Sequence, residues 1–586
     1  MRHNIFLLVL FSGVLSSILS HPVWAIDPND RLENFQLLSH LGKSHELYYL
    51  SDARAVVLMS VNNNCPALDD SLKQFQQTRE MYRDKGVEFL LLNSDLGDDR
   101  QAIVREAERL GIESPILLDR TQLIGEALGI ESSADVFVVD TKSWKLAYRG
   151  GTAQLNASLD SVLAGETVDL VSSKPSGCEI NFAERAVKQQ HAEISYSETI
   201  APILIDNCIT CHREGGIGPW VMADYNMIRG FSPMIREVIR TQRMPPWHAD
   251  PAYGDFDNDR SLSTEEIQTL VHWIEAGSPR GKGPDTLARV EHNWPEWGMG
   301  NEPDLVIEIP GYEVPATGIV DYQYPEVTNP LDHDVWVRAS EIIPGDRQAL
   351  HHVITRFYIP DPSARGNGRF GRRGGGLGGY VPGAVARQYP DGTGTLLPAG
   401  ATINFQMHYT PYGKATSDTS RIGLYFHDEA PAHKMAGTVL MNTKISIPAN
   451  TKAHTEFKSQ VLKRDVLVYS MLPHSHYRGI ASDFVAYYPD GTEEILLSVP
   501  AYDFNWQTTY VLKEPKVLPA GTKIVHSTTW DNSAQNPANP DPNRTVPWGQ
   551  QSHDEMLFGA ISFRYLEEVE KDSSAGVDQF QGTGSD

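Results

Sequence analysis

The hydrophobic pattern changes twice along this chain of 586 residues, and these changes constrain its fold more than any other feature. Between about residues 55 and 139, short apolar runs alternate with helical patterns, which predicts an α/β domain. Residues 195–281 have a helical pattern and are rich in Met and Trp. Beyond Pro303, short alternating runs punctuated by Gly and Pro predict all-β sandwiches. A chain of this length is also too long for one hydrophobic core, so several domains are expected.

Individual elements follow from the same patterns. The sequence predicts strands at 55–61, 87–93, 136–139, 304–309 and 401–409, and helices at 69–85 and 262–276. Ser263 and Glu266 have the spacing of a capping box at the start of the second helix. Glu266 also completes an EF-hand-like spacing of acidic residues, but Arg260 stands where the calcium loop requires glycine, so we exclude a calcium site.

The N-terminus predicts export. Arg2 and His3 precede an apolar stretch at 5–19, and Ala25 ends a segment with the features of a cleavage site. An uncleaved membrane anchor is the alternative, although the stretch is short for a span. We therefore expect a periplasmic mature protein without a membrane span, in an oxidising compartment. The formal net charge of −25 argues against a nucleic-acid partner.

Residues 208–212 read Cys-Ile-Thr-Cys-His, which is the attachment signature of a c-type haem. In this motif the thiols of Cys208 and Cys211 bond covalently to the haem, and His212 binds the iron. The alternative is a CxxC disulfide or half of a zinc site. Neither a thioredoxin-like strand–helix context nor a second ligand pair lies nearby, so the sequence favours one covalent haem c.

The second axial ligand of this haem is less constrained. Four methionines follow the motif, and each could instead fill a core. We favour Met244, because the two prolines after it prevent a helix and hold an extended loop. The segment resembles small cytochrome c modules, which have CxxCH near the start, an MPPW loop and a terminal helix; the other three candidates are Met222, Met227 and Met234.

The histidines after residue 340 fall in a pattern rather than at random: His351 and His352, then His408, then His474 and His476, with Met556 further on. Imidazole and thioether are ligands of copper that cycles between Cu(I) and Cu(II). Taken singly, each His could equally be a structural, hydrogen-bonded residue. His474 and His476 would share one face of a strand. Adjacent histidines point to opposite faces, so joint binding by His351 and His352 requires a bulge or a strand end.

In order and local sequence, these sites resemble the peptidylglycine alpha-hydroxylating and dopamine beta-monooxygenase family. The matching stretches are the His-His pair, FQMHY at 405–409, PHSHYRG at 473–479 and DEM at 554–556, within a resemblance that covers about 303–565. The resemblance implies two jelly-roll-type sandwiches and two copper ions. The electron-transfer copper would be held by His351, His352 and His408, and the catalytic, oxygen-binding copper by His474, His476 and Met556.

Cys65-Pro66 follows an apolar strand pattern and precedes a helical one, and it resembles the redoxin branch of the thioredoxin-like fold. A helix N-terminus would lower the pKa of the Cys65 thiol. However, Cys65 is not part of a CxxC motif. Asn62 stands where this branch has Thr, and Ala134 stands where it usually has a cis-proline. Retained redox chemistry at Cys65 therefore stays open, as does a structural or resolving disulfide with Cys178.

These predictions divide the chain as follows: signal peptide 1–25, thioredoxin-like domain 26–172, linker 173–194, cytochrome c module 195–285, linker 286–302, copper-binding sandwiches 303–430 and 431–566, and a disordered acidic tail 567–586. The leading hypothesis is a copper-dependent monooxygenase that hydroxylates a C–H bond of a small organic or peptide-like substrate with O2. An external electron donor would act through the haem. The alternative is a non-catalytic copper-binding, electron-transfer or redox-sensing protein.

Overall fold

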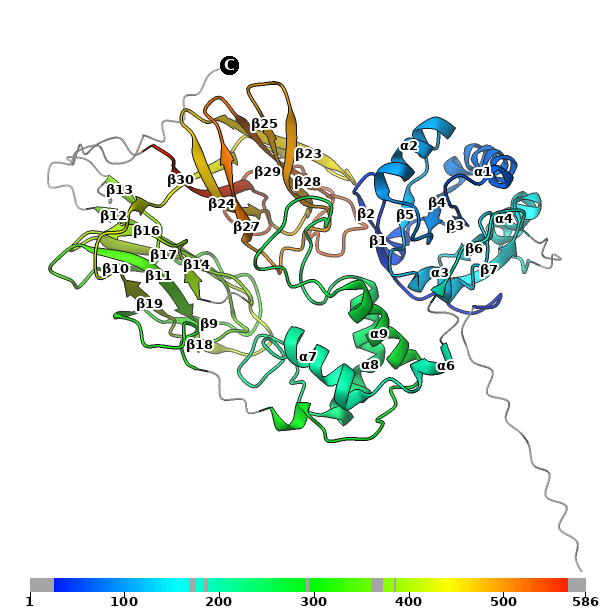
Figure 1. The fold of residues 1–586 in the computed structure, drawn as a ribbon. Coiled ribbons are helices and arrows are strands. Elements are labelled where there is room, and N and C mark those ends of the chain that lie inside the picture. Colours follow the sequence, from blue (N-terminus) through cyan, green and yellow to red (C-terminus); the bar gives the residue numbers. More distant parts are fainter. Residues whose placement is uncertain are drawn as a thin grey trace, which may run out of the picture.

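A computed structural model describes residues 26–168, 175–183, 188–290, 295–359, 372–383 and 386–567. It contains an α/β domain, a helical region and two β-sandwiches (Figure 1). The predicted signal peptide and the tail beyond residue 567 lie outside the described residues. Within the described ranges, no helix combines the length and the apolar character needed to cross a membrane.

The α/β domain is built on a five-stranded sheet with the order β5-β4-β3-β6-β7, in which β3, β4 and β5 are parallel. The central strand β3 is buried on both faces: Ala55, Val57 and Met59 face one core, and Val56 and Leu58 face the other. This explains its continuous apolar run. The elements are β3 (Ala55–Ser60), β4 (Val87–Asn93), β5 (Ile116–Leu118), β6 (Val136–Asp140), β7 (Lys145–Gly150), α1 (Asp69–Tyr82), α2 (Arg100–Leu110), α3 (Leu123–Leu128) and α4 (Leu155–Ala164).

In the helical region, α7, α8 and α9 contribute to a core that contains fully buried Trp273. The predicted capping box of Ser263 and Glu266 is confirmed at the start of the last helix. Residues 247–258, expected to belong to this region alone, also pack on the second sandwich, where Trp247 and Phe256 join its core. The helices are α6 (Lys188–His191), α7 (Ala201–Asn207), α8 (Tyr225–Arg240) and α9 (Thr264–Glu275).

The first sandwich places two sheets face to face around one core. One sheet contains β10 (Glu326–Thr328), β12 (Leu350–Ile359), β13 (Arg372–Gly375), β14 (Gly379–Tyr380) and β17 (Thr402–Tyr409). The other contains β8 (Leu305–Glu308), β11 (Val335–Ile343), β15 (Arg387–Gln388), β16 (Thr393–Leu397), β19 (Arg421–Phe426) and β20 (His433–Lys434).

The second sandwich has two four-stranded sheets around its own core. The first has the order β21-β30-β24-β27, and the second has the order β23-β28-β25-β26. The strands are β21 (Ala436–Asn442), β23 (His454–Val461), β24 (Val466–His474), β25 (Gly479–Tyr487), β26 (Glu493–Val499), β27 (Tyr510–Leu518), β28 (Lys523–Trp530) and β30 (Leu557–Tyr565).

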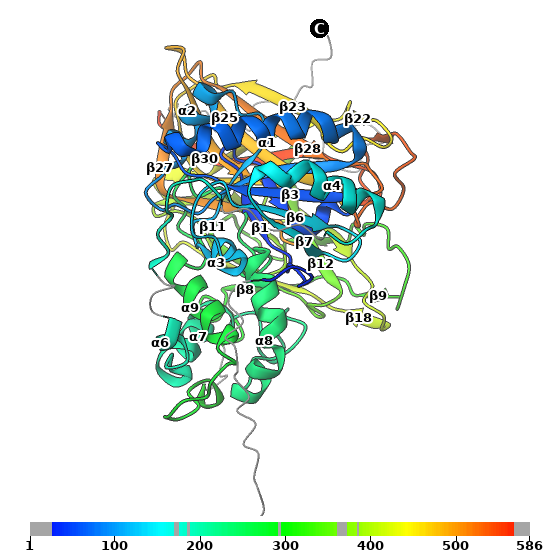
Figure 2. The same cartoon turned by 90° about the vertical axis from the view of Figure 1, so that its right-hand side faces the viewer.

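The units contact one another directly. Figure 2 shows the α/β domain in front of the sandwiches, with the helical region below. Arg100 of the α/β domain forms an ion pair of 2.7 Å with buried Asp250. Asp250 lies within the 247–258 segment that packs on the second sandwich. His272 on α9 lies 2.9 Å from Glu126 of the α/β domain, and both side chains are buried. The helical region is therefore held between the α/β domain and the sandwiches.

Candidate metal centre and haem-attachment segment

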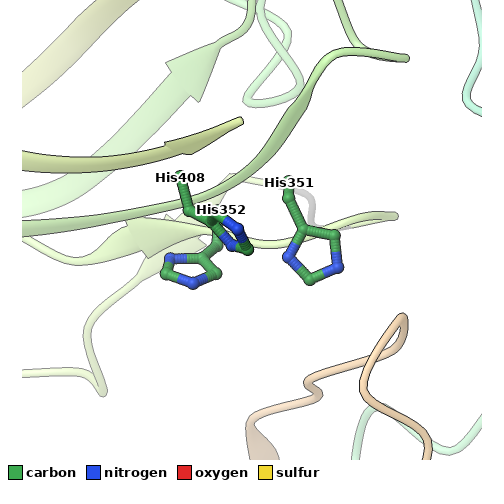
Figure 3. Close-up of side chains that lie close together, drawn as sticks. All are labelled: His351, His352 and His408. Atoms are coloured by element: carbon green, nitrogen blue, oxygen red, sulfur yellow. The ribbon is translucent and has the colours of Figure 1, made fainter. Parts of the chain in front are cut away.

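The first three histidines converge on neighbouring strands of the first sandwich. His352 on β12 is the direct partner of His408 on β17, and the register shifts between Leu350 and His352. Joint binding by two adjacent histidines requires a bulge or a strand end, and this irregularity in the register lies at His351. The candidate ligand atoms of His351, His352 and His408 all lie within 4.8 Å of one another, and all three residues are buried (Figure 3). One ion could therefore contact all three.

The second set begins where β24 ends. His474 is the last residue of this strand and His476 follows it in the loop, so the prediction that both share one strand face is wrong. Their rings nevertheless approach to 5.2 Å between centroids, at an angle of 89°. Met556 directly precedes β30, and this strand pairs Phe558 with His474. The chain therefore brings Met556 to the end of the sheet that carries His474.

The two sets meet across the boundary between the sandwiches. The ring centroids of His352 and His474 are 6.0 Å apart. Phe504, from the second sandwich, stacks on His351 at 4.6 Å. The resemblance implied one set on each sandwich, and the structure gathers all five imidazoles into a single buried cluster, which we call the histidine cluster.

The ring nitrogens of the first set show a consistent pattern. Nε2 of His408 lies 3.2 Å from the Ser552 hydroxyl, and Nε2 of His352 lies 3.4 Å from the Tyr322 hydroxyl. Nδ1 of both histidines is buried without a partner, as are both ring nitrogens of His351. Buried polar atoms without partners are costly, so these nitrogens fit a metal ion that would satisfy them.

In the second set the pattern is reversed. Nδ1 of His474 donates to Oε1 of Gln507 at 2.6 Å, and Nδ1 of His476 donates to the carbonyl oxygen of Asp554 at 3.2 Å. Each bond fixes the tautomer that leaves the Nε2 lone pair free, as in other metal-binding histidines. Nε2 of His476 is buried without a partner. The second set would thus bind metal through Nε2 and the first through Nδ1.

The electrostatic environment keeps these imidazoles neutral. Burial lowers the pKa of His351 and of His474 to about 4. Burial, together with the neighbouring imidazoles, holds the pKa of His352, His408 and His476 well below the usual value. Neutral imidazole is the form that binds metals, so at neutral pH no proton has to be displaced.

Glu555 ties the second set together. Its fully buried carboxylate accepts hydrogen bonds from the Ser475 hydroxyl and from the backbone N–H groups of His476 and Arg478, at 2.7–2.9 Å. Trp530 Nε1 donates a fourth at 3.0 Å. Burial raises the pKa of Glu555 to about 7 in spite of these donors. The residue next to Met556 therefore anchors the loop that carries His476.

The haem-attachment segment follows α7. Cys208 and Cys211 carry free thiols, and burial raises the pKa of Cys208 to about 12 and also raises that of Cys211. A nucleophile would need a thiolate, which this environment disfavours. Nδ1 of His212 lies 3.0 Å from the Trp220 carbonyl oxygen, so its N–H donates there and Nε2 is available to iron. These residues fit a covalently attached haem.

The four methionine candidates differ in their surroundings. Met222 is 5% exposed and lies in the core of the helical region, whereas Met227 and Met234 are exposed on α8. Met244 is partly buried in the loop after α8. Met244 neither fills the core, as Met222 does, nor lies exposed on a helix, as Met227 and Met234 do. It therefore remains the favoured ligand.

In the α/β domain, Cys65 and Cys178 form a disulfide that spans 113 residues. The backbone N–H of Ser133 donates to the Cys178 carbonyl oxygen at 2.9 Å, and the Ser133 hydroxyl accepts from the Cys178 N–H at 2.9 Å. Ala134 follows with a positive φ of 64°. Of the two open alternatives for Cys65, the structure has the disulfide.

Three contributors to the site were not anticipated from the sequence: Phe504, Gln507 and Glu555. Glu555 lies inside the DEM stretch, and a carboxylate next to a candidate ligand is a recognisable signal. Phe504 and Gln507 follow β26 in a loop, and in the sequence they resemble ordinary core and surface residues. Only the tertiary structure brings them to His351 and His474.

Comparison with known proteins identifies one part of the chain. Residues 28–149 match the AhpC/TSA family and form a thioredoxin-like domain. A search of the curated proteins gave no significant match. The family match therefore covers the α/β domain and leaves the haem-attachment segment and the histidine cluster outside it.

Several solved structures are similar to part of the chain. A hypothetical protein from Sinorhizobium meliloti shares 22% identity, covering 27% of this chain and 96% of its own, with a TM-score of 0.25. An uncharacterized conserved protein from Geobacillus kaustophilus shares 26% identity over 27% of this chain and 92% of its own, with the same TM-score. Peroxidoxin BcpB from Mycobacterium tuberculosis shares 18% identity over 24% and 95%, with a TM-score of 0.21.

Proposed function

We propose that this chain is an exported, periplasmic copper-dependent monooxygenase that hydroxylates a C–H bond of a small organic or peptide-like substrate with O2, with electrons supplied through a covalently attached haem. The observation that carries the proposal is the histidine cluster, in which unpartnered nitrogens of buried, neutral imidazoles converge from two sandwiches. The cysteine pair and His212 support the haem. The Cys65–Cys178 disulfide supports an oxidising compartment.

Copper, when bound, would supply one-electron chemistry between Cu(I) and Cu(II) and the reduction of O2. His351, His352 and His408 would hold one ion, and His474, His476 and Met556 the other. The two donor sets differ, since a thioether favours Cu(I) and three imidazoles can hold either oxidation state. A storage protein would not require two different sets, so the difference supports catalysis.

The surrounding residues orient these ligands and exclude water. Gln507 and the Asp554 carbonyl fix the rings of His474 and His476, and Glu555 holds the loop between them. All five histidines are at most 8% exposed. A buried site of this kind limits the loss of reactive oxygen species to water. No acid or base side chain is needed for removal of a hydrogen atom from a C–H bond.

Oxygen uptake by the fully metallated protein, measured against a panel of candidate substrates, tests the proposal. We expect substrate-dependent uptake and a hydroxylated product that carries one atom from 18O2. His474→Ala should abolish both, while exposed His333→Ala should leave them unchanged. Product formation that persists in His474→Ala, or uptake that remains independent of substrate across the panel, would contradict the proposed function.

A further inference from the structure

One loop of the second sandwich contacts both sets of the histidine cluster and also reaches the haem-attachment segment. This loop, residues 502–507, connects β26 to β27. Its contacts involve Tyr502, Phe504, Trp506 and Gln507: Phe504 and Gln507 contact the histidine cluster, and Trp506 lies on the side of the CxxCH segment. The arrangement links two candidate redox sites that belong to different folding units.

At the metal end, the loop touches one residue of each set. Phe504 stacks on His351 with a centroid distance of 4.6 Å and an interplanar angle of 14°. Gln507 accepts a hydrogen bond from His474 Nδ1 at 2.6 Å. Phe504 also lies 6.0 Å from the His408 ring, so it packs against the first set from the side of the second sandwich.

At the haem end, the loop approaches Cys211 across Gly383 of the first sandwich. A Cβ built on Gly383 would lie 3.5 Å from the Trp506 ring and 3.8 Å from Sγ of Cys211. Arg260 donates to the Gly383 carbonyl oxygen at 2.8 Å, which fixes this backbone against the helical region. The indole and Sγ of Cys211 therefore both lie beside Gly383, whose positive φ of 73° favours glycine.

The loop is also held rigidly between these ends. The Tyr502 hydroxyl donates to the Ser475 carbonyl oxygen at 2.8 Å and accepts from the Ser475 N–H at 3.0 Å. Within the loop, Gln507 Nε2 donates to the Phe504 carbonyl oxygen at 3.2 Å. These bonds fix the loop backbone at Tyr502 and at Phe504.

We infer that the 502–507 loop is the electron path between the haem on Cys211 and the copper held by His351, with Trp506 at its haem end and Phe504 at its copper end. This inference rests on the proposed function. Electron transfer through protein falls steeply with the distance that is not bridged by bonds or packed atoms. This route runs from Cys211 past Gly383 to Trp506, along the loop backbone to Phe504, and from its ring to the stacked ring of His351. In the step, one electron leaves ferrous haem iron, which becomes ferric, and one cupric ion becomes cuprous. No bond forms or breaks, and no proton is transferred.

The test follows this step in the full-length protein loaded with haem and cupric ions under anaerobic conditions. A laser flash in the presence of a photoexcited one-electron donor reduces the haem, and haem absorbance follows its reoxidation. We expect Trp506→Leu to slow reoxidation at least about tenfold, equivalent to about 1.4 kcal/mol of activation free energy. Trp506→Phe, which keeps an aromatic ring, should recover part of the rate, and Phe504→Leu should slow it independently.

Trp144→Leu is the matched control, because Trp144 is also a half-buried tryptophan but lies in the α/β domain. Haem potential and copper content are measured in every variant, so that a purely structural effect is recognised. Parent-like reoxidation in both Trp506→Leu and Phe504→Leu, at unchanged potential and copper content, would overturn the path. Absence of covalent haem or of copper from the parent protein would instead overturn the proposed function.

Discussion

His352 of the first sandwich and His474 of the second meet edge to face, with ring centroids 6.0 Å apart and planes at 88°. Each belongs to a different ligand set, so the sandwich boundary passes through the histidine cluster. Any relative movement of the two sandwiches would change this contact. The hydrogen bond between Ser552 and His408, which crosses this boundary, therefore also helps to set the geometry of the candidate metal centre.

Glu555→Gln should weaken the second metal set while leaving the first intact. The amide nitrogen of glutamine would face donors that the carboxylate now accepts from, at Ser475 and the backbone of His476 and Arg478. We expect copper affinity at the second set to fall about 10- to 100-fold, the usual effect of losing a group that orients ligands. Competitive chelator titration measures it, with exposed Glu429→Gln as the control. Equal loss at both sets would indicate a general folding defect.

Met244→Ala and Met222→Ala should have opposite consequences. If Met244 binds the haem iron, its removal should lower the haem potential and abolish any sulfur-to-iron charge-transfer band, while the haem stays attached. Met222→Ala should leave the spectrum unchanged and destabilise the helical region by about 2–5 kcal/mol, because Met222 is buried in its core. Redox titration and thermal unfolding separate the two effects. A lost band in Met222→Ala alone would reverse the assignment.

Removing the disulfide with Cys178→Ser should destabilise the α/β domain. The bond closes a loop of 113 residues, and the loop-closure argument gives about 3–5 kcal/mol for a loop of this size. Chemical unfolding of the domain, compared with the parent under non-reducing conditions, measures the effect. If the disulfide is structural, copper-dependent activity should be unchanged. Loss of activity in a folded Cys178→Ser variant would show that the cysteine pair takes part in the redox chemistry.

Acid should destabilise the second sandwich through His526. Burial lowers the pKa of this fully buried imidazole from 6.5 to about 3. The unfolded chain therefore binds a proton below about pH 6.5, which the folded chain does not bind until about pH 3. The contribution of neutral His526 to the free energy of unfolding is fully present above this window. It is lost as the pH falls through the window, by about 2 kcal/mol between pH 7 and pH 5. His526→Gln should reduce this loss in metal-free protein, and exposed His333→Gln should not.

Much of this architecture could be predicted from sequence patterns because the elements are locally encoded. The strand at 136–139 is continuously apolar and that at 87–93 is apolar apart from Glu88 and Asn93. The His351–His352 pair required a bulge or a strand end for joint binding, and the structure has a register shift there. Contacts between units could not be predicted in this way. Nothing near Phe504 marks it as a partner of His351, and Trp247 has the same local pattern whether it packs on the helical region or on the second sandwich.

Metal analysis of the purified protein and two variants tests the central claim most directly. The account predicts two copper ions per chain, of which His351→Ala loses one and His474→Ala loses the other. Because His351 stacks on Phe504 rather than on a metal-binding residue of the second set, the second site should stay occupied in His351→Ala. A single copper ion per chain in the parent protein, or loss of both ions in each variant, would contradict two separate ligand sets.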